Sequence, residues 1–210
     1  MKKSLSTRIT VLTALVLSLT FLCACSNENG DNNNENILNQ DLTASDINAL
    51  LFMLEEEKLA RDTYMFLDNQ WSLNQFANIQ NSEQTHMDAV ESLLIQYGID
   101  YNILPVGEFE NQTLQDFYNQ FITEGSVSQI NALKVGAKIE DLDIVDLQDH
   151  LVATANTDLL LVFSSLQCGS KNHLRSFVHG IENLGSIYEP QFLTSEGYNS
   201  IISSSHEQCN

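Results

Sequence analysis

The chain has 210 residues, which is enough for one domain with a substantial core and short extensions. Its 28 acidic and 9 basic residues give a formal net charge of −19, which excludes nucleic acid and anionic membrane patches as electrostatic partners. The 4 cysteines include no Cys-x-x-Cys pair, which excludes a four-cysteine zinc site or a rubredoxin-type iron site.

Residues 1–24 have the pattern of a bacterial secretory signal. Three basic residues precede an apolar run over 9–22, which is too short for a membrane span. Small Ala24 stands before Cys25, as in a lipobox, so we expect Cys25 to carry a lipid. The protein would then be exported and anchored to the membrane of the cell envelope. The alternatives are an uncleaved anchor helix and a signal peptide without lipidation.

The exported chain divides into a tether, a domain and a tail. Loss of the signal segment would leave 28 acidic and 6 basic residues, a formal charge of −22. Residues 25–42 are rich in Asn and favour a flexible tether. The domain is expected over 43–188 and the tail over 189–210. Cys168 and Cys209 lie far apart in the sequence, so their spacing allows a disulfide without establishing one.

A first helix is predicted from residue 43 onward, because residues 43–46 have the spacing of a capping box. Apolar residues then recur at steps of three and four, which is one face of a helix. Glu57 falls on this face, and Glu55 lies off it toward solvent. Glu56 is the alternative, since a neighbouring apolar stripe would carry it inward.

A second helix over about 76–97 has Glu83 and His86 on its apolar face. A buried carboxylate is costly unless it is paired, hydrogen-bonded or bound to a metal. Residues 99–110 are expected to form a loop, and 114–122 a short amphipathic helix. We interpret these two segments as a long crossover that covers a bundle.

A third helix, over about 128–151, carries Glu140 on its apolar face. Asp143 follows one turn later and therefore lies next to Glu140 on the helix surface. Asp141 is expected to face solvent. His150 lies two turns beyond Asp143 and is a candidate neighbour of the site.

A fourth helix is predicted over 157–184, with His173 on its apolar face and Ser170 one turn before it. A single histidine on such a face is more often a hydrogen-bonded core residue than a ligand. Here three other helices also direct polar groups inward. The pattern as a whole predicts an all-α fold, a four-helix bundle with a polar centre.

The inward polar residues have the composition of a two-metal carboxylate site. Two divalent cations would offset the charge of four buried carboxylates. Neutral imidazole suits iron, carboxylates suit iron or manganese, and the lack of thiolates disfavours structural zinc. We therefore expect two iron ions, with manganese or a single metal ion as alternatives. The candidate ligands are Glu57, Glu83, His86, Glu140, Asp143 and His173.

Several segments resemble known families. Residues 57–64 resemble the Glu-x-x-Ala-x-x-x-Tyr segment of rubrerythrin-type ferritin-like proteins, and Glu83-x-x-His86 resembles their second-helix motif. A closer resemblance is to the ferritin-like domain-of-unknown-function 2202 family, over roughly residues 45–185. The segments that carry it are 54–61, 82–87 and 169–175.

The resemblance implies a ferritin-like four-helix bundle with a long crossover between its second and third helices. By position, Tyr64 would stand beside the metal ligands as a partner, and His173 matches the histidine of the fourth-helix Glu-x-x-His motif. Ser170 departs from that motif, which has glutamate there. Either Asp143 supplies the missing carboxylate, or the second metal ion is weakly held.

The expected function is a di-iron oxidoreductase, peroxidase- or ferroxidase-like, acting on peroxide, dioxygen or ferrous iron. An external electron donor is then a required partner, because the chain has no rubredoxin-like segment; a homodimer is also envisaged. The alternatives are a metal-binding or sensing lipoprotein without turnover, and a helical interaction module without metal. Hydrolase motifs such as Gly-x-Ser-x-Gly and His-Glu-x-x-His are absent.

Overall fold

The computed structural model describes residues 42–209, and every regular element within that range is a helix. The expected all-α fold is thereby confirmed. The signal segment, Cys25 and the tether up to residue 41 lie outside the described residues. Within 42–209, no helix is long and apolar enough to cross a membrane. The helices are α1 (Ala44–Trp71), α2 (Asn74–Gln96), α3 (Gln112–Gly125), α4 (Gln129–Ala153), α5 (Thr157–Asn183) and α6 (Ser195–Ser203).

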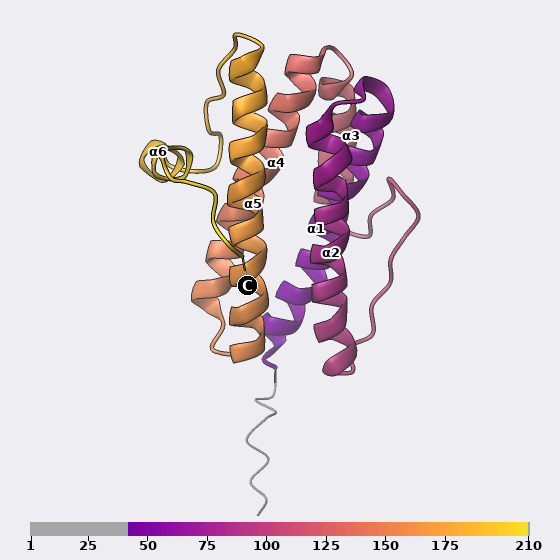
Figure 1. Cartoon of the computed structure of the whole chain (residues 1–210). Helices are drawn as coiled ribbons and strands as arrows, with labels where there is room; N and C mark the ends of the chain where they lie inside the picture. Colours follow the sequence, from indigo (N-terminus) through magenta and orange to yellow (C-terminus); the bar gives the residue numbers. More distant parts are fainter. Residues whose placement is uncertain (1–41, 210) are drawn as a thin grey trace, which may run out of the picture. The chain divides into compact units, whose positions relative to one another are not determined.

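Four long helices form the bundle, with α1 packed on α2 and α4 packed on α5 (Figure 1). Helix α1 runs antiparallel to α4, because Tyr64 contacts Glu140 near one end while Asp46 contacts Thr154 at the other. The expected crossover is present: a loop and α3 connect α2 to α4, and α3 packs on α1 and α4.

The first helix begins at the predicted capping box. The hydroxyl oxygen of Thr43 accepts a hydrogen bond from the amide of Asp46 at 3.1 Å, and the Asp46 carboxylate accepts one from the amide of Thr43 at 2.9 Å. Asp46 also accepts a hydrogen bond from the hydroxyl of Thr154 at 2.6 Å. The cap of α1 is therefore joined to the end of α4.

The apolar core is divided into two clusters by a polar layer at mid-bundle. One cluster lies on the side of the α1 C-terminus, and the other lies on the side of the α1 N-terminus. Tyr64, Phe76 and Phe177 pack together in the first, with ring centroids 5.2 to 5.8 Å apart. The second is built on Leu50, Met53, Leu94, Leu159 and Phe163.

A buried lysine fixes the crossover against α1. The ammonium of Lys58 donates to the carboxylate of Asp62 at 2.6 Å and to the carbonyl oxygens of Pro105 and Glu108 at 2.9 and 3.0 Å. The cation also lies 4.2 Å from the ring centroid of Phe109. Because the crossover covers this face, α1 is buried on several sides over residues 56–60.

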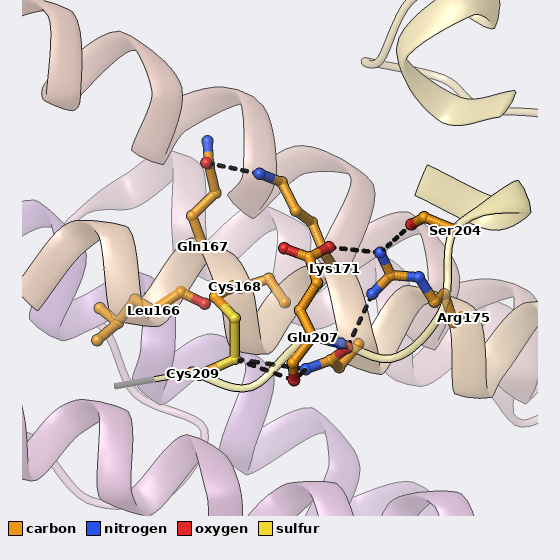
Figure 2. Close-up of a disulfide and its surroundings, with 10 residues drawn as sticks. Leu166, Gln167, Cys168, Lys171, Arg175, Ser204, Glu207 and Cys209 are labelled. Atoms are coloured by element: carbon orange, nitrogen blue, oxygen red, sulfur yellow. Dashed lines mark hydrogen bonds and ion pairs between the residues drawn. A yellow bond between two sulfur atoms is a disulfide. The ribbon is translucent and has the colours of Figure 1, made fainter. Parts of the chain in front are cut away.

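The C-terminal tail is more ordered than the sequence indicates. It contains α6, which packs on α5, and a disulfide joins Cys168 to Cys209 (Figure 2). The guanidinium of Arg175 donates to the carboxylate of Glu207 at 2.5 Å and to the hydroxyl of Ser204 at 2.6 Å. The end of the chain is thus held against α5 by both covalent and polar contacts.

Asp141 corrects one expectation, because it is fully buried rather than solvent-facing. Its carboxylate accepts a hydrogen bond from the hydroxyl of Tyr188 at 2.8 Å and one from the amide of Leu193 at 2.7 Å. The amides of Gln191 and Phe192 also donate to it. A charged carboxylate with four donors is stable in the interior. Asp141 therefore holds the start of the tail against α4.

Candidate metal centre

Five of the candidate ligands meet between the two apolar clusters. Glu57 comes from α1, Glu83 and His86 from α2, Glu140 from α4 and His173 from α5. The three glutamates are each 2% exposed, so their carboxylates are removed from water and need compensation. The two imidazoles lie at the edge of this layer and stack with centroids 5.5 Å apart.

The five side chains form two triads that share Glu83. Glu57, Glu83 and His86 form the first triad; Glu83, Glu140 and His173 form the second. Within each triad, one ligand atom per residue lies within 4.8 Å of the others. Oε2 of Glu83 lies 2.8 Å from Nδ1 of His86, and Oε1 lies 2.8 Å from Nδ1 of His173. Glu83 therefore joins the two triads, and two adjacent ions would share its carboxylate.

The side chains pair with one another in part, as where Nδ1 of His86 contacts Oε2 of Glu57 at 3.1 Å, but some donor atoms stay unpaired. Oε1 of Glu57, Oε1 of Glu83 and Nδ1 of His173 are buried without a hydrogen-bond partner in the described part of the chain. The last two atoms are 2.8 Å apart but not aligned for a hydrogen bond. Neighbouring ligands of an octahedral ion with bonds of 2.0–2.1 Å lie about 3 Å apart. These spacings and orphaned atoms therefore suit a shared cation.

Burial and mutual charge control protonation in the layer. Burial raises the pKa of Glu57 to about 7, although His86 offsets part of the rise. Burial, with the charge of Glu83 next, raises the pKa of Glu140 to about 6. Burial would lower the pKa of His173, but Glu83 and Glu140 outweigh it and raise that pKa to about 10. The carboxylates thus require nearby positive charge, which protonated imidazoles or metal ions can provide.

Tyr64 lies beside Glu140 of the second triad. Its side chain is fully buried, and its hydroxyl donates to Oε1 of Glu140 at 2.5 Å. Burial, followed by the charge of Glu140, raises the pKa of Tyr64 well above its usual range. The phenol therefore stays protonated and orients the Glu140 carboxylate, leaving Oε2 directed toward His173 at 3.5 Å.

Asp143 is buried but lies outside both triads. Its Oδ2 accepts a short hydrogen bond from the hydroxyl of Ser170, and its Oδ1 has no partner among residues 42–209. Ser170, which stands where the ferritin-like fourth-helix Glu-x-x-His motif has glutamate, therefore holds Asp143 and faces neither triad. Burial, with the charge of Glu57 next, raises the pKa of Asp143 well above its usual range.

Gly169 is a site residue that the sequence reasoning missed. A Cβ at this position would lie 2.6 Å from Nε2 and 2.7 Å from Cε1 of His86. The imidazole of His86 therefore packs directly against the backbone of α5, while its Nδ1 faces Glu83. The available signal was a glycine inside a predicted helix, where it is unfavourable by about 1 kcal/mol relative to alanine.

Comparisons with known proteins agree with this fold. The domain described as "Uncharacterized protein domain (DUF2202)" matches residues 46–205. "Uncharacterized protein MJ0754" of Methanocaldococcus jannaschii is 46% identical over 171 residues, which are 80% of this chain and 92% of that relative. The crystal structure of hypothetical protein MJ0754 from Methanococcus jannaschii DSM 2661 has a TM-score of 0.80 and 45% identity, covering 81% of this chain and 99% of that one. The chain therefore belongs to the DUF2202 family.

Proposed function

We propose that this protein binds two metal ions, iron first among the candidates, and uses them in redox chemistry on peroxide, dioxygen or ferrous iron. The observation that carries the proposal is the pair of triads joined by Glu83, with buried donor atoms that lack hydrogen-bond partners. Imidazole and carboxylate together suit iron. Two adjacent redox-active ions would supply the two electrons that reduction of peroxide requires.

The protein's own residues would position the ions and control access to them. Glu83 would bridge, with His86 and Glu57 on one side and His173 and Glu140 on the other. The apolar clusters above and below the layer limit water at the centre. Tyr64 holds a proton at Oε1 of Glu140 and so fixes that carboxylate. The imidazoles, about a tenth exposed, are more accessible to solvent than the three glutamates.

A second candidate is a metal-binding or sensing protein without turnover. Ser170 favours it, because its hydroxyl is committed to Asp143 and α5 brings no carboxylate to the centre. The second ion would then have fewer ligands. In either case the N-terminal segment, with Cys25 as the lipid attachment site, supports placing the protein at the cell envelope.

A turnover assay distinguishes the redox enzyme from the metal-binding protein. Purified protein is loaded anaerobically with ferrous iron and mixed with hydrogen peroxide, and peroxide loss and iron oxidation are followed. We expect multiple turnovers when a reductant is supplied, and loss of activity in Glu83→Ala. Tight metal binding with no turnover would support the second candidate. Equal activity in Glu83→Ala would refute the redox proposal.

A further inference from the structure

Glu56 is a buried carboxylate that the metal centre does not use. It is 2% exposed and stands next to Glu57 on α1, yet it belongs to neither triad. Neither of its side-chain oxygens has a hydrogen-bond partner among the described residues. A lone buried carboxylate in this state is costly, so Glu56 must be neutralised by a proton or by a bound cation.

The charged groups that act most strongly on Glu56 are also acidic. It faces Asp146 of α4 at hydrogen-bonding range, but two carboxylates cannot donate to each other. The negative charge of Asp143 also repels the carboxylate of Glu56. Oδ1 of Asp143, like both oxygens of Glu56, has no hydrogen-bond partner among the described residues. The charges with the largest effect on Glu56 are all negative.

The antiparallel register of α1 and α4 arranges these acids from the surface inward. Phe52 of α1 packs on His150 of α4 with ring centroids 5.9 Å apart, and Glu56 and Asp146 each lie one turn closer to the bundle centre. Asp149 is exposed, Asp146 is half-buried, and Glu56 and Asp143 are buried. Glu57 of the first triad is the next residue after Glu56 on α1.

Asp146, Glu56 and Asp143 form a row of acids from the surface inward. A divalent cation would satisfy this row better than a proton would. One proton neutralises one carboxylate, whereas a divalent cation offsets two charges and accepts the free oxygens as ligands. The geometry also limits how tightly it would be held. Among residues 42–209, Glu56 forms no group in which three ligand atoms lie within 4.8 Å of one another, unlike the two triads. The row is therefore suited to transient contact with a passing cation rather than to tight binding of one.

We propose that Asp146, Glu56 and Asp143 form an approach path along which divalent cations pass between α1 and α4 to the Glu57 triad. This inference rests on the proposed metal centre, and it adds how the centre is loaded. It also accounts for the two adjacent buried glutamates on α1: Glu57 holds an ion and Glu56 delivers it. The competing path is the α2–α5 edge, where His86 and His173 are partly exposed.

The test is the rate of metal uptake, measured separately from the final amount bound. Metal-free protein is mixed with Co²⁺ in a stopped-flow instrument, and the visible absorbance of protein-bound cobalt is followed. Glu56→Gln and Asp146→Asn should load about tenfold more slowly than wild type, because each substitution replaces a carboxylate oxygen that would ligate a passing cation. Their final metal-to-chain ratio should equal that of wild type.

Glu55→Gln is the matched control, because Glu55 lies on the same helix but binds the amides of Glu110 and Asn111 on the crossover side. It should load at the wild-type rate. A double variant, Glu56→Gln with Asp146→Asn, should load no more slowly than about the slower single variant, since both act on one path. Far-UV circular dichroism and the unchanged final ratio report that the variants fold.

Two results would overturn the approach path in distinguishable ways. Wild-type uptake rates in Glu56→Gln and Asp146→Asn, with normal final ratios, would place the path at the α2–α5 edge and leave the metal centre intact. Failure of wild-type protein to bind cobalt at all would refute the metal centre and, with it, the path.

Discussion

Nδ1 of His173 lies 2.8 Å from Oε1 of Glu83, although the two atoms are not aligned to share a hydrogen bond. Both atoms are buried, so neither is satisfied by water. An arrangement in which two strong polar atoms approach closely without bonding is expected when both are directed at a third species. On the other side of Glu83, Oε2 lies 2.8 Å from Nδ1 of His86, which also contacts Oε2 of Glu57 at 3.1 Å. These close approaches around Glu83 are the basis of the two-ion interpretation.

The backbone at Gly169 is expected to be essential for the first triad. In Gly169→Ala the new Cβ would lie 2.6 Å from Nε2 of His86, so the imidazole must leave its present position in the first triad. We expect the metal-to-chain ratio to fall from about two to about one, because only the second triad stays intact. Elemental analysis after dialysis measures it.

The control for this variant is Ser164→Ala, on the exposed side of the same helix. It should bind metal as wild type does. An unchanged ratio in Gly169→Ala would show that His86 is not a ligand.

Asp141 is expected to stabilise the tail without affecting the metal centre. In Asp141→Asn the charge is lost, and the amide group that replaces one oxygen faces backbone donors of residues 191–193. The free energy of unfolding should fall by about 3 kcal/mol, as for loss of charge-assisted hydrogen bonds. Urea denaturation measures this, and limited proteolysis should cut the segment before α6 sooner. Loss of bound metal in this variant would contradict the separation of the two roles.

The disulfide should stabilise the protein by closing a long loop. Cys168 and Cys209 are separated by 41 residues, and for a loop of this size the chain-entropy estimate is about 4 kcal/mol. Because Arg175 and Glu207 hold the tail independently, we expect Cys209→Ser to lose about 2–4 kcal/mol and to keep its fold. Dithiothreitol should lower wild-type stability by the same amount and leave Cys209→Ser unchanged. A reductant effect on both proteins would exclude the disulfide as the cause.

The capping box should make stability depend on acid pH. Burial alone would raise the pKa of Asp46, but hydrogen bonds from Thr154 and Thr43 outweigh it and lower that pKa from 3.8. Because the folded state favours the carboxylate, its contribution is complete above the unfolded pKa and is lost as pH falls through the lowered value. The difference in unfolding free energy between wild type and Asp46→Asn should therefore be constant near neutral pH and shrink below about pH 4. A difference that grows toward low pH would contradict this.

The bundle could be predicted because four helices have clear periodicity and start signals. Thr43 and Asp46 mark the first helix by local chemistry alone, and the structure has the same contacts. Helix α6 could not be predicted in this way. Its 9 residues include serine and glycine, and it is stabilised by packing on α5 rather than by its own pattern.

The site was predictable to the extent that an acid on an apolar stripe signals burial. Glu57, Glu83 and Glu140 met this condition. Asp141 did not, because its donors come from residues about 50 positions later and leave no local signal. Glu56 could not be separated from Glu57 by periodicity, because α1 is covered by helices and by the crossover and buries consecutive residues there.

The most direct test of the central claim is the number of metal ions bound per chain. Purified protein is reconstituted anaerobically with ferrous iron, freed of excess metal, and analysed beside Glu57→Ala and Glu83→Ala. We predict about two ions for wild type, about one for Glu57→Ala, and close to none for Glu83→Ala, because only Glu83 belongs to both triads. A folded wild-type protein that retains no iron, or a Glu83→Ala variant that retains the wild-type amount, would contradict the account.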